Sequence, residues 1–299
     1  MTTWHGSMAM VSMAIVSMTM VGCAEVAPEL EGAEQSLITI GRYQVVTATG
    51  PLTTAADQQV IATCPKGTVA LGGGHAGIES TGAYVAAYAQ ASAPLSSARW
   101  LVKGHFDQAA ATPWRLRVRV LCGAAPAGFT WAVVDSALDA TPSKQVAPAC
   151  PAGQVGLGGG FAILDGGGGF LPGESTYAMP AWDGASWLVN GAAAPGTAAW
   201  KLRGYAICAS AAALPGYQVV TVSSPLDSQP QQQVAPTCPA GTATTGGGWG
   251  VVDATGAILT GHGHELEPLY DGTGWLTTAE NRSGFAPTWQ LQGRAICLP

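Results

Sequence analysis

Charged residues are scarce in this chain of 299 residues, where they make up 10% of the sequence, against about a quarter in an ordinary soluble domain. The net charge at pH 7 is −6, so the sequence lacks the clustered positive charge that binding to a nucleic-acid backbone requires. Glycine occurs 41 times, and this composition is typical of many short strands joined by tight turns rather than of long helices. We therefore expect an all-β protein that does not bind nucleic acid.

The sequence also lacks the motifs of common enzyme and cofactor sites. It has no Gly-x-Ser-x-Gly and no His-Glu-x-x-His, and its glycine runs are not followed by the lysine and helix start of a phosphate-binding loop. No cysteine has a second cysteine close by in the chain, as zinc fingers and ribbons require. These absences predict a protein that is not an enzyme, with no catalytic residue and no cofactor.

One sequence pattern occurs three times along the chain. Each copy opens with Cys-Pro-x-Gly, enters a triple glycine after four more residues, and closes on a strand that begins with Trp and ends with Cys. The copies run from Cys64 to Cys122, from Cys150 to Cys208 and from Cys238 to Cys297. The internal period of 86 to 89 residues predicts three tandem antiparallel β repeats of about 86 residues. Their expected bounds are 43–127, 128–213 and 214–299, and they could lie in a row or around a pseudo-threefold axis.

The opening of each repeat resembles part of a known protein family. The stretch Cys-Pro-x-Gly-x4-Gly, at 64–72, 150–158 and 238–246, is similar to one in the vitelline membrane outer layer protein. The fold of that protein is a three-sided β-prism. The resemblance therefore favours the closed arrangement of the three repeats over the linear one.

The closing strand of each repeat alternates between two kinds of side chain. In the first repeat the residues from Trp114 to Cys122 alternate between apolar positions and Arg115, Arg117 and Arg119, which places the two sets on opposite faces of a strand. We expect the arginines on the solvent face, although this basic stripe could instead bind an anionic sugar, a phosphate or lipid A. The triple glycines indicate a β-bulge or a close approach to a large side chain, for which Trp is the obvious candidate.

The N-terminus predicts export. Residues 8–22 form an apolar run of the length of a signal-peptide core, too short for a comfortable transmembrane helix, so 1–22 is expected to be a signal peptide. It ends in Met20-Val21-Gly22-Cys23, which resembles the lipobox of bacterial lipoproteins, although Met20 stands where Leu is usual and no Lys or Arg precedes the core. The resemblance implies that Cys23 is lipidated, that 23–42 is an acidic tether, and that the lipid anchors the protein to a membrane. Ordinary secretory cleavage after Ala24 is the alternative.

The cysteine count supports this interpretation. Seven cysteines is an odd number for an exported protein, and lipidation of Cys23 would leave one pair in each repeat. The expected disulfides join Cys64 to Cys122, Cys150 to Cys208 and Cys238 to Cys297. Each would stabilise its repeat by roughly 4 kcal/mol in the chain-entropy model and would place the protein in an oxidising compartment. The expected location is the bacterial cell envelope, at the outer membrane or cell surface, or outside the cell.

The variable segments carry the candidate binding residues. Aromatic side chains suited to stacking on sugar rings or gripping a partner protein are Tyr84, Tyr88, Tyr177, Trp249 and Tyr270, although these rings could equally cover the ends of the β units. His262 and His264 lie on the same side of a predicted strand and form the best candidate metal site, against the alternative of a polar loop.

Three near-equal repeats indicate multivalent binding rather than one privileged active site. The favoured function is an exported, lipid-anchored surface protein without catalytic activity, which binds glycan or protein in carbohydrate recognition or adhesion. The alternative is a structural envelope or coat protein without a discrete ligand. A metal-dependent hydrolase that uses His262 and His264 comes third.

Overall fold

The computed structural model describes residues 40–259, 261–280 and 288–299. The expected signal peptide, Cys23 and the acidic tether therefore lie outside the described residues. Among the described residues, no helix has the length and apolar character needed to cross a membrane. The described residues belong to one compact unit, Gly32–Pro299.

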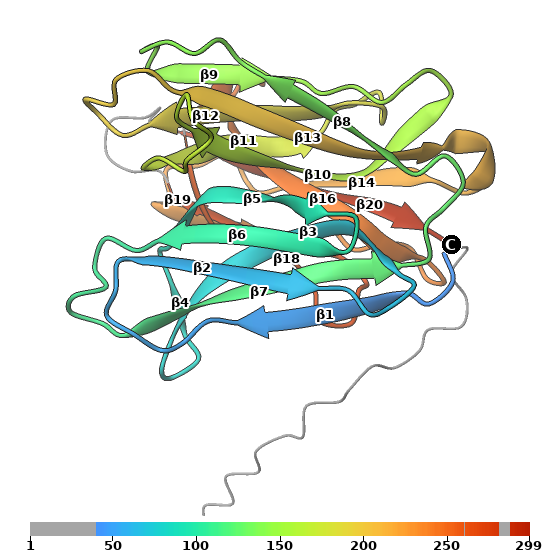
Figure 1. Ribbon diagram of the computed structural model, residues 1–299, viewed down its shortest axis with the longest axis horizontal. Coiled ribbons are helices and arrows are strands. Elements are labelled where there is room, and N and C mark those ends of the chain that lie inside the picture. The colour runs from blue at the N-terminus through green and yellow to red at the C-terminus, as the bar shows by residue number, and fades with distance from the viewer. Residues whose placement is uncertain (1–39, 260, 281–287) are drawn as a thin grey trace, which may run out of the picture. The chain divides into compact units, whose positions relative to one another are not determined.

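The chain folds almost entirely into strands, arranged in three antiparallel sheets (Figure 1). In sheet order, sheet A contains β1 (Gln44–Thr49), β7 (Trp114–Gly123), β3 (Val69–Glu79), β18 (His262–Pro268), β19 (Trp275–Glu280) and β15 (Gln231–Val234), with β4 (Tyr84–Val85) paired to β3. Sheet B contains β2 (Asp57–Thr63), β6 (Arg99–His105), β5 (Tyr88–Ser96), β10 (Gln154–Leu164), β13 (Lys201–Ser210) and β8 (Thr130–Asp135). Sheet C contains β14 (Gln218–Ser223), β20 (Gln290–Leu298), β16 (Ala243–Val252), β11 (Gly173–Pro180), β12 (Trp187–Ala193) and β9 (Ser143–Val146), with β17 (Ile258–Leu259) paired to β16. One 3-10 turn, η1 (Ala211–Ala213), precedes β14.

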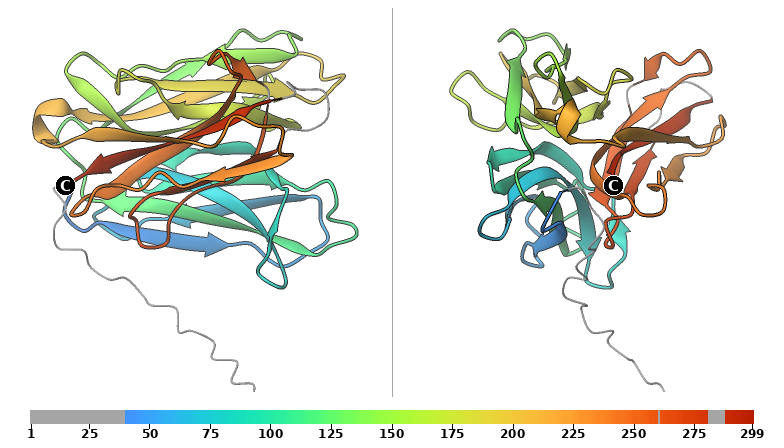
Figure 2. Two further views of the ribbon diagram at one scale, coloured as in Figure 1. Left: turned by 180° about the vertical axis from the view of Figure 1, so that it is seen from behind. Right: turned by 90° about the vertical axis from the view of Figure 1, so that its right-hand side faces the viewer.

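The expected all-β fold of three repeated modules is confirmed, and the sheets close into a ring. Each repeat gives its first, third and last strands to one sheet, where the two-residue strands β4 and β17 also pair, and its other three strands to the next sheet. Sheet A thus joins repeats 1 and 3, sheet B joins 1 and 2, and sheet C joins 2 and 3. Figure 2 (right) shows the repeats, in blue, green to yellow and orange to red, around a common axis. The closed arrangement is therefore the one adopted, and no repeat forms a sheet of its own.

The repeats meet within each sheet along a short ladder, which we call the seam. The seam of sheet A pairs β3 with β18 through Ala76 and Glu265 and through His75 and Leu266. The seam of sheet B pairs β10 with β5, and that of sheet C pairs β16 with β11, again through two residue pairs each. Side chains near the seams therefore come from distant parts of the sequence.

The triple glycines let the three inner strands approach one another. A β-bulge lies at the start of each triplet, between Ala70 and Gly72, Gly156 and Gly158, and Thr244 and Gly246. A Cβ on the first glycine of any triplet would collide with backbone of another repeat's inner strand, and a Cβ on the middle glycine would collide with Trp100, Trp187 or Trp275. Both expected roles of the glycines, a bulge and a contact with Trp, are confirmed.

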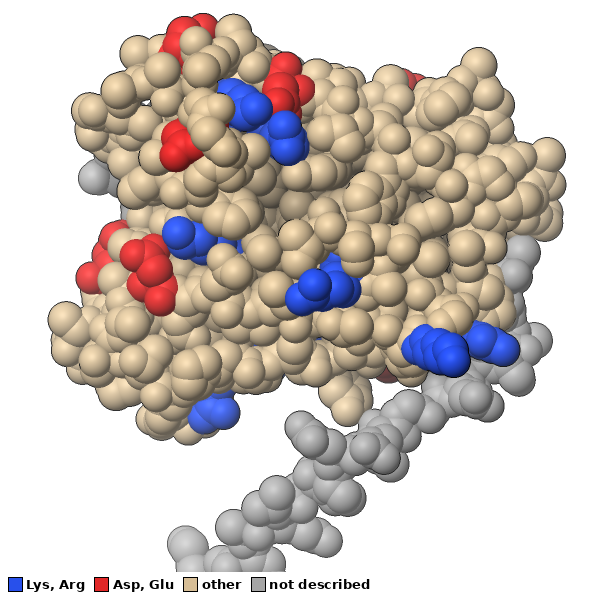
Figure 3. Space-filling model, in the orientation of Figure 1, with Lys and Arg blue, Asp and Glu red and all other residues tan. Residues whose placement is uncertain are grey.

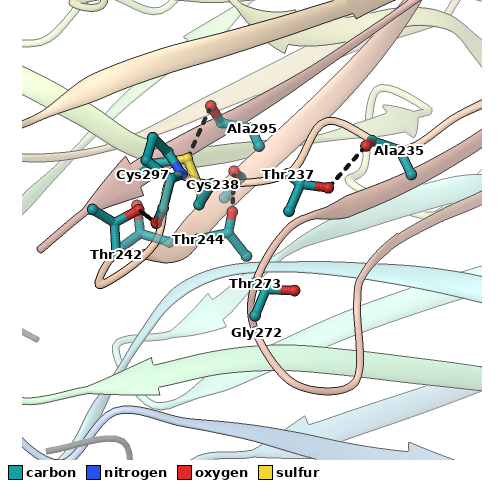
Figure 4. The surroundings of a disulfide bond; sticks show 12 residues. Ala235, Thr237, Cys238, Thr242, Thr244, Gly272, Thr273, Ala295 and Cys297 are labelled. Carbon is teal, nitrogen blue, oxygen red and sulfur yellow. Dashed lines mark hydrogen bonds between the residues drawn. A yellow bond between two sulfur atoms is a disulfide. The ribbon is translucent and has the colours of Figure 1, made fainter. Parts of the chain in front are cut away.

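Disulfides and a second set of tryptophans complete the core of each repeat. The three disulfides have the expected pairing, with Cα atoms 5.5 to 5.6 Å apart. Figure 4 shows the third of them, which ties the turn before β16 to the end of β20. The Trp that opens each closing strand is buried and donates its indole N–H to a backbone carbonyl, from Trp114 to Ala55, Trp200 to Thr141 and Trp289 to Gln229. The disulfides indicate an oxidising or extracellular environment.

Candidate functional site

The seam of sheet A gathers charged side chains on the face that points away from the core. Arg117 and Arg119 alternate along β7 with core residues, and Glu267 reaches them from β18 of the third repeat. Arg117 binds the Glu267 carboxylate through Nη2 at 2.5 Å and Nε at 3.2 Å. Arg119 Nη1 lies 3.1 Å from the same carboxylate and donates to the Pro268 carbonyl at 3.1 Å. The expectation that these arginines lie on an open solvent face is wrong, because a distant glutamate covers and pairs with them.

Burial sets the electrostatics of this cluster. Glu267 is fully buried, and the two arginines are mostly buried. Burial opposes the charge of Arg117, but the hydrogen bond and charge of Glu267 outweigh it and raise the Arg117 pKa. For Arg119 burial prevails and lowers the pKa. Two cations thus share one internal carboxylate, since the neighbouring Glu265 is bound instead by Thr278 and Gln233.

Two of the predicted aromatic residues cover these arginines. The Tyr84 ring lies over Arg117, with 5.4 Å between ring centroid and guanidinium carbon, and its hydroxyl accepts a hydrogen bond from Arg117 Nη2 at 3.0 Å. The Tyr270 ring lies over Arg119 at 5.5 Å. Both tyrosines remain substantially exposed, Tyr84 by 45% and Tyr270 by 53%. Each tyrosine ring therefore lies over an arginine and remains about half exposed.

Sheet C repeats this arrangement with a residue that the sequence analysis did not select. Arg294 of β20 donates to the Pro180 carbonyl at 2.5 Å, and the Trp182 ring lies 3.6 Å from its guanidinium carbon. Trp182 is the most exposed of the large hydrophobic residues described, at 75%. A comparison of the repeats could have found it, because Pro180-Ala181-Trp182 occupies the place of Pro268-Leu269-Tyr270.

Sheet B departs from this pattern. At the place of Arg119 and Arg294 it has Tyr205, and Asp135 on β8 neutralises Arg203 at 2.6 Å and Lys201 at 2.8 Å. Hydrogen bonds from Arg203 lower the Asp135 pKa to about 2. The residue two positions after Pro94 is Ser96, so no ring stands where Tyr270 and Trp182 stand. In Figure 3 the face over β6, β5 and β13 is mostly uncharged, with Lys, Arg, Asp and Glu in small separate groups.

The other predicted aromatic residues are less accessible. Trp249 and Tyr177 are buried, so the expectation that they are exposed is wrong for these two. Tyr177 covers Gly250, where a Cβ would collide with its ring, and the Trp249 ring packs against Gly263 in the same way. Tyr88 is half-buried against His105, with ring centroids 5.2 Å apart. Only glycine leaves room for the Tyr177 ring, which the sequence pattern alone does not reveal.

The structure does not gather the two predicted metal-binding histidines into a ligand set. His262 Nδ1 contacts the Glu174 carboxylate of β11. His264 lies at the bulge of β18, with Nε2 3.3 Å from Glu280. In the parts of the chain that the structure describes, no group of three or more His, Cys, Asp or Glu is placed to hold a metal ion. The pair therefore gains no support as a metal site.

A small cavity lies where the three sheets meet. Its volume is about 30 Å³, and the residues that follow the triple glycines, His75, Phe161 and Trp249, contribute to its wall. This volume suits one or two water molecules rather than a sugar ring. Burial, and then the nearby His264, lower the His75 pKa to about 4. The axial cavity is thus a part of the core, and the exposed rings of sheets A and C are the candidate binding surfaces.

No protein-family model matches the sequence, and no curated protein is significantly similar to it.

Proposed function

We propose that this protein is an exported, non-enzymatic glycan-binding protein, whose ligands stack on exposed aromatic rings at the seams of sheets A and C. The observation that carries the proposal is the repeated pairing of an exposed ring with a buried arginine, in Tyr84, Tyr270 and Trp182. Tyr and Trp are enriched at binding interfaces, because each combines a large apolar surface with a polar group. Here three of them each lie over a guanidinium group.

The arginines prepare the rings for binding. A guanidinium on one side of a ring restricts its orientation, which reduces the entropy lost when a ligand orders it. The exposed part of each ring can contact the apolar face of a pyranose. Aromatic side chains also combine large contact area with a rigid shape. Two such sites on different sheets can bind one polymer together, so that weak individual affinities combine.

The proposed location is the bacterial cell envelope, at the outer membrane or cell surface, with secretion as the alternative. The three disulfides support an oxidising compartment. Lipidation at Cys23 would attach the protein to the membrane, and the acidic tether 23–42 would hold the binding faces away from it. A structural coat protein without a ligand is the competing proposal, and it does not require the rings to be exposed.

A glycan array probed with the mature chain from Glu25 tests the proposal. We expect binding to one or more glycan classes, reduced at least tenfold in Tyr270→Ala and in Trp182→Ala. Leu95→Ala is the matched control, because Leu95 is an exposed residue just after the proline of the third, ring-free seam. Failure to bind any glycan would support the coat protein instead, and an equal loss in the Leu95→Ala control would show that glycan binding does not depend on the rings.

A further inference from the structure

Arg294 carries a buried charge without a counter-ion. The residue is 1% exposed, and its guanidinium donates to the Pro180 carbonyl, lies against the Trp182 ring and is close to Tyr177. Its Nε has no hydrogen-bond partner among the described residues, and no carboxylate of that part of the chain forms an ion pair with it. A buried guanidinium without an anion is costly, so this feature requires an explanation.

Sheet A shows what the missing partner would be. Arg119 and Arg294 are equivalent, since Arg119 pairs across its ladder with Gly74 and Arg294 pairs with Gly248, the third glycine of each triplet. A Cβ on Gly74 would meet Glu267, and one on Gly248 would meet Met179. Glu267 and Met179 therefore occupy the same place in the two seams. The arginine of sheet A has an internal carboxylate, and the arginine of sheet C has a thioether instead.

We infer that Arg294 and Trp182 form a binding site for the carboxylate of an acidic sugar, a uronic acid residue in a glycan chain. This inference rests on the proposed function and adds the ligand class to it. The ligand would supply from outside the carboxylate that Glu267 supplies from within in sheet A. Charge-assisted hydrogen bonds from guanidinium to carboxylate are among the strong polar contacts of proteins, and the sugar ring can stack on the indole at the same time.

Trp182 controls access to the arginine. Its ring lies over the guanidinium, and three quarters of the residue is exposed. A shift of the indole toward solvent uncovers the Nη and Nε atoms and leaves the ring against the bound sugar. Met179 is fully buried, which means that the carboxylate must enter from the solvent side rather than along the strand.

The test compares oligogalacturonate with its methyl ester, which has the same length and no charge, by isothermal titration calorimetry at constant ionic strength. We expect the acid to bind at least tenfold more tightly than the ester. Arg294→Met should remove this preference. Met179→Glu should remove it too, because it installs an internal carboxylate where sheet A has Glu267. Leu95→Ala should leave it unchanged, and thermal unfolding of each variant identifies any that fails to fold.

The outcomes separate this inference from the proposed function. Equal binding of acid and ester, lost in Trp182→Ala, would overturn the acidic ligand while the glycan-binding function stands. A preference for the acid that persists in folded Arg294→Met would also overturn it. Should Met179→Glu not fold, Arg294→Met decides alone. Absence of binding to either oligosaccharide, together with a blank glycan array, would reject both proposals.

Discussion

The seams of sheets A and C share a backbone arrangement and differ in how they treat charge. Both place an arginine beside the third glycine of a triplet, both bind it to a proline carbonyl, and both cover it with an exposed ring. Sheet A adds Glu267 and a second arginine, Arg117, where sheet C has Met179 and Gln292. The comparison indicates that the carboxylate is not needed to build the seam. The presence or absence of this carboxylate decides whether the arginine has its counter-ion within the protein or must take one from a ligand.

The largest expected effect comes from breaking the cluster of sheet A. Glu267→Met gives this seam the residue of sheet C but leaves Arg117 and Arg119 buried without an anion. Removing one partner of a buried ion pair typically costs about 3 to 5 kcal/mol. We expect a loss of that size in the free energy of unfolding, measured by urea denaturation with the disulfides intact.

A second substitution distinguishes ion pairing from packing. Arg117→Gln in the Glu267→Met background makes the seam match sheet C, which has Gln292 at this place, so part of the lost stability should return. Residues in one network show coupling of about 0.5 to 3 kcal/mol in double-mutant cycles. No recovery in the double variant would mean that Glu267 acts through its packing alone, and the contrast between the two seams would then not be one of charge.

The features of the fold that follow from local spacing could be read from the sequence. The cysteine pairs, the alternation of the closing strands and the contact of Trp with glycine all depend on residues within one repeat, and the structure confirms them. The exchange of strands between repeats was not predicted, apart from the hint of a closed arrangement, because every repeat would show the same internal pattern in a linear array.

The site was harder to predict for the same reason. Arg117 and Arg119 looked like a solvent-facing stripe because the glutamate that pairs with them is about 150 residues away in the chain. Trp249 and Tyr177 looked exposed because nothing in the sequence shows which glycine faces which ring. Trp182 could have been found by aligning Pro94, Pro180 and Pro268 of the three repeats. In that alignment Trp182 is the equivalent of Tyr270.

On the core side of the seams, the residue after each triple glycine also differs between the sheets. His75 in sheet A occupies the position of Phe161 in sheet B and Trp249 in sheet C. With a pKa lowered to about 4, native His75 stays neutral at pH values where the unfolded chain takes up a proton. Stability should therefore fall as the pH drops from about 6.5 to 4, by up to about 3 kcal/mol.

His75→Phe should remove this dependence, measured as unfolding free energy at several pH values between 4 and 7. His264 is the titratable group that faces His75. Nearby Glu265 has the opposite effect on stability, because burial raises its pKa. Its contribution to the free energy of unfolding is therefore lost as the pH rises. The matched swap is Phe161→His, which should add an acid-dependent loss in sheet B. An unchanged slope in His75→Phe would show that His75 does not govern this pH range.

The smallest expected effect on stability concerns the rings that cover the arginines. Tyr270→Ala removes a cation–π contact worth about 0.5 to 1 kcal/mol at an exposed site, while Arg119 keeps Glu267. Trp182→Ala loses a closer contact, but it lets water reach Arg294, whose pKa is lowered by burial, and hydration of that charge offsets the loss. We therefore expect Trp182→Ala to change the unfolding free energy by less than about 0.5 kcal/mol, although the ring is nearer to its arginine. A cost of about 2 kcal/mol or more in the same urea titration would make Trp182 a structural cap, and its exposure would then no longer argue for a ligand.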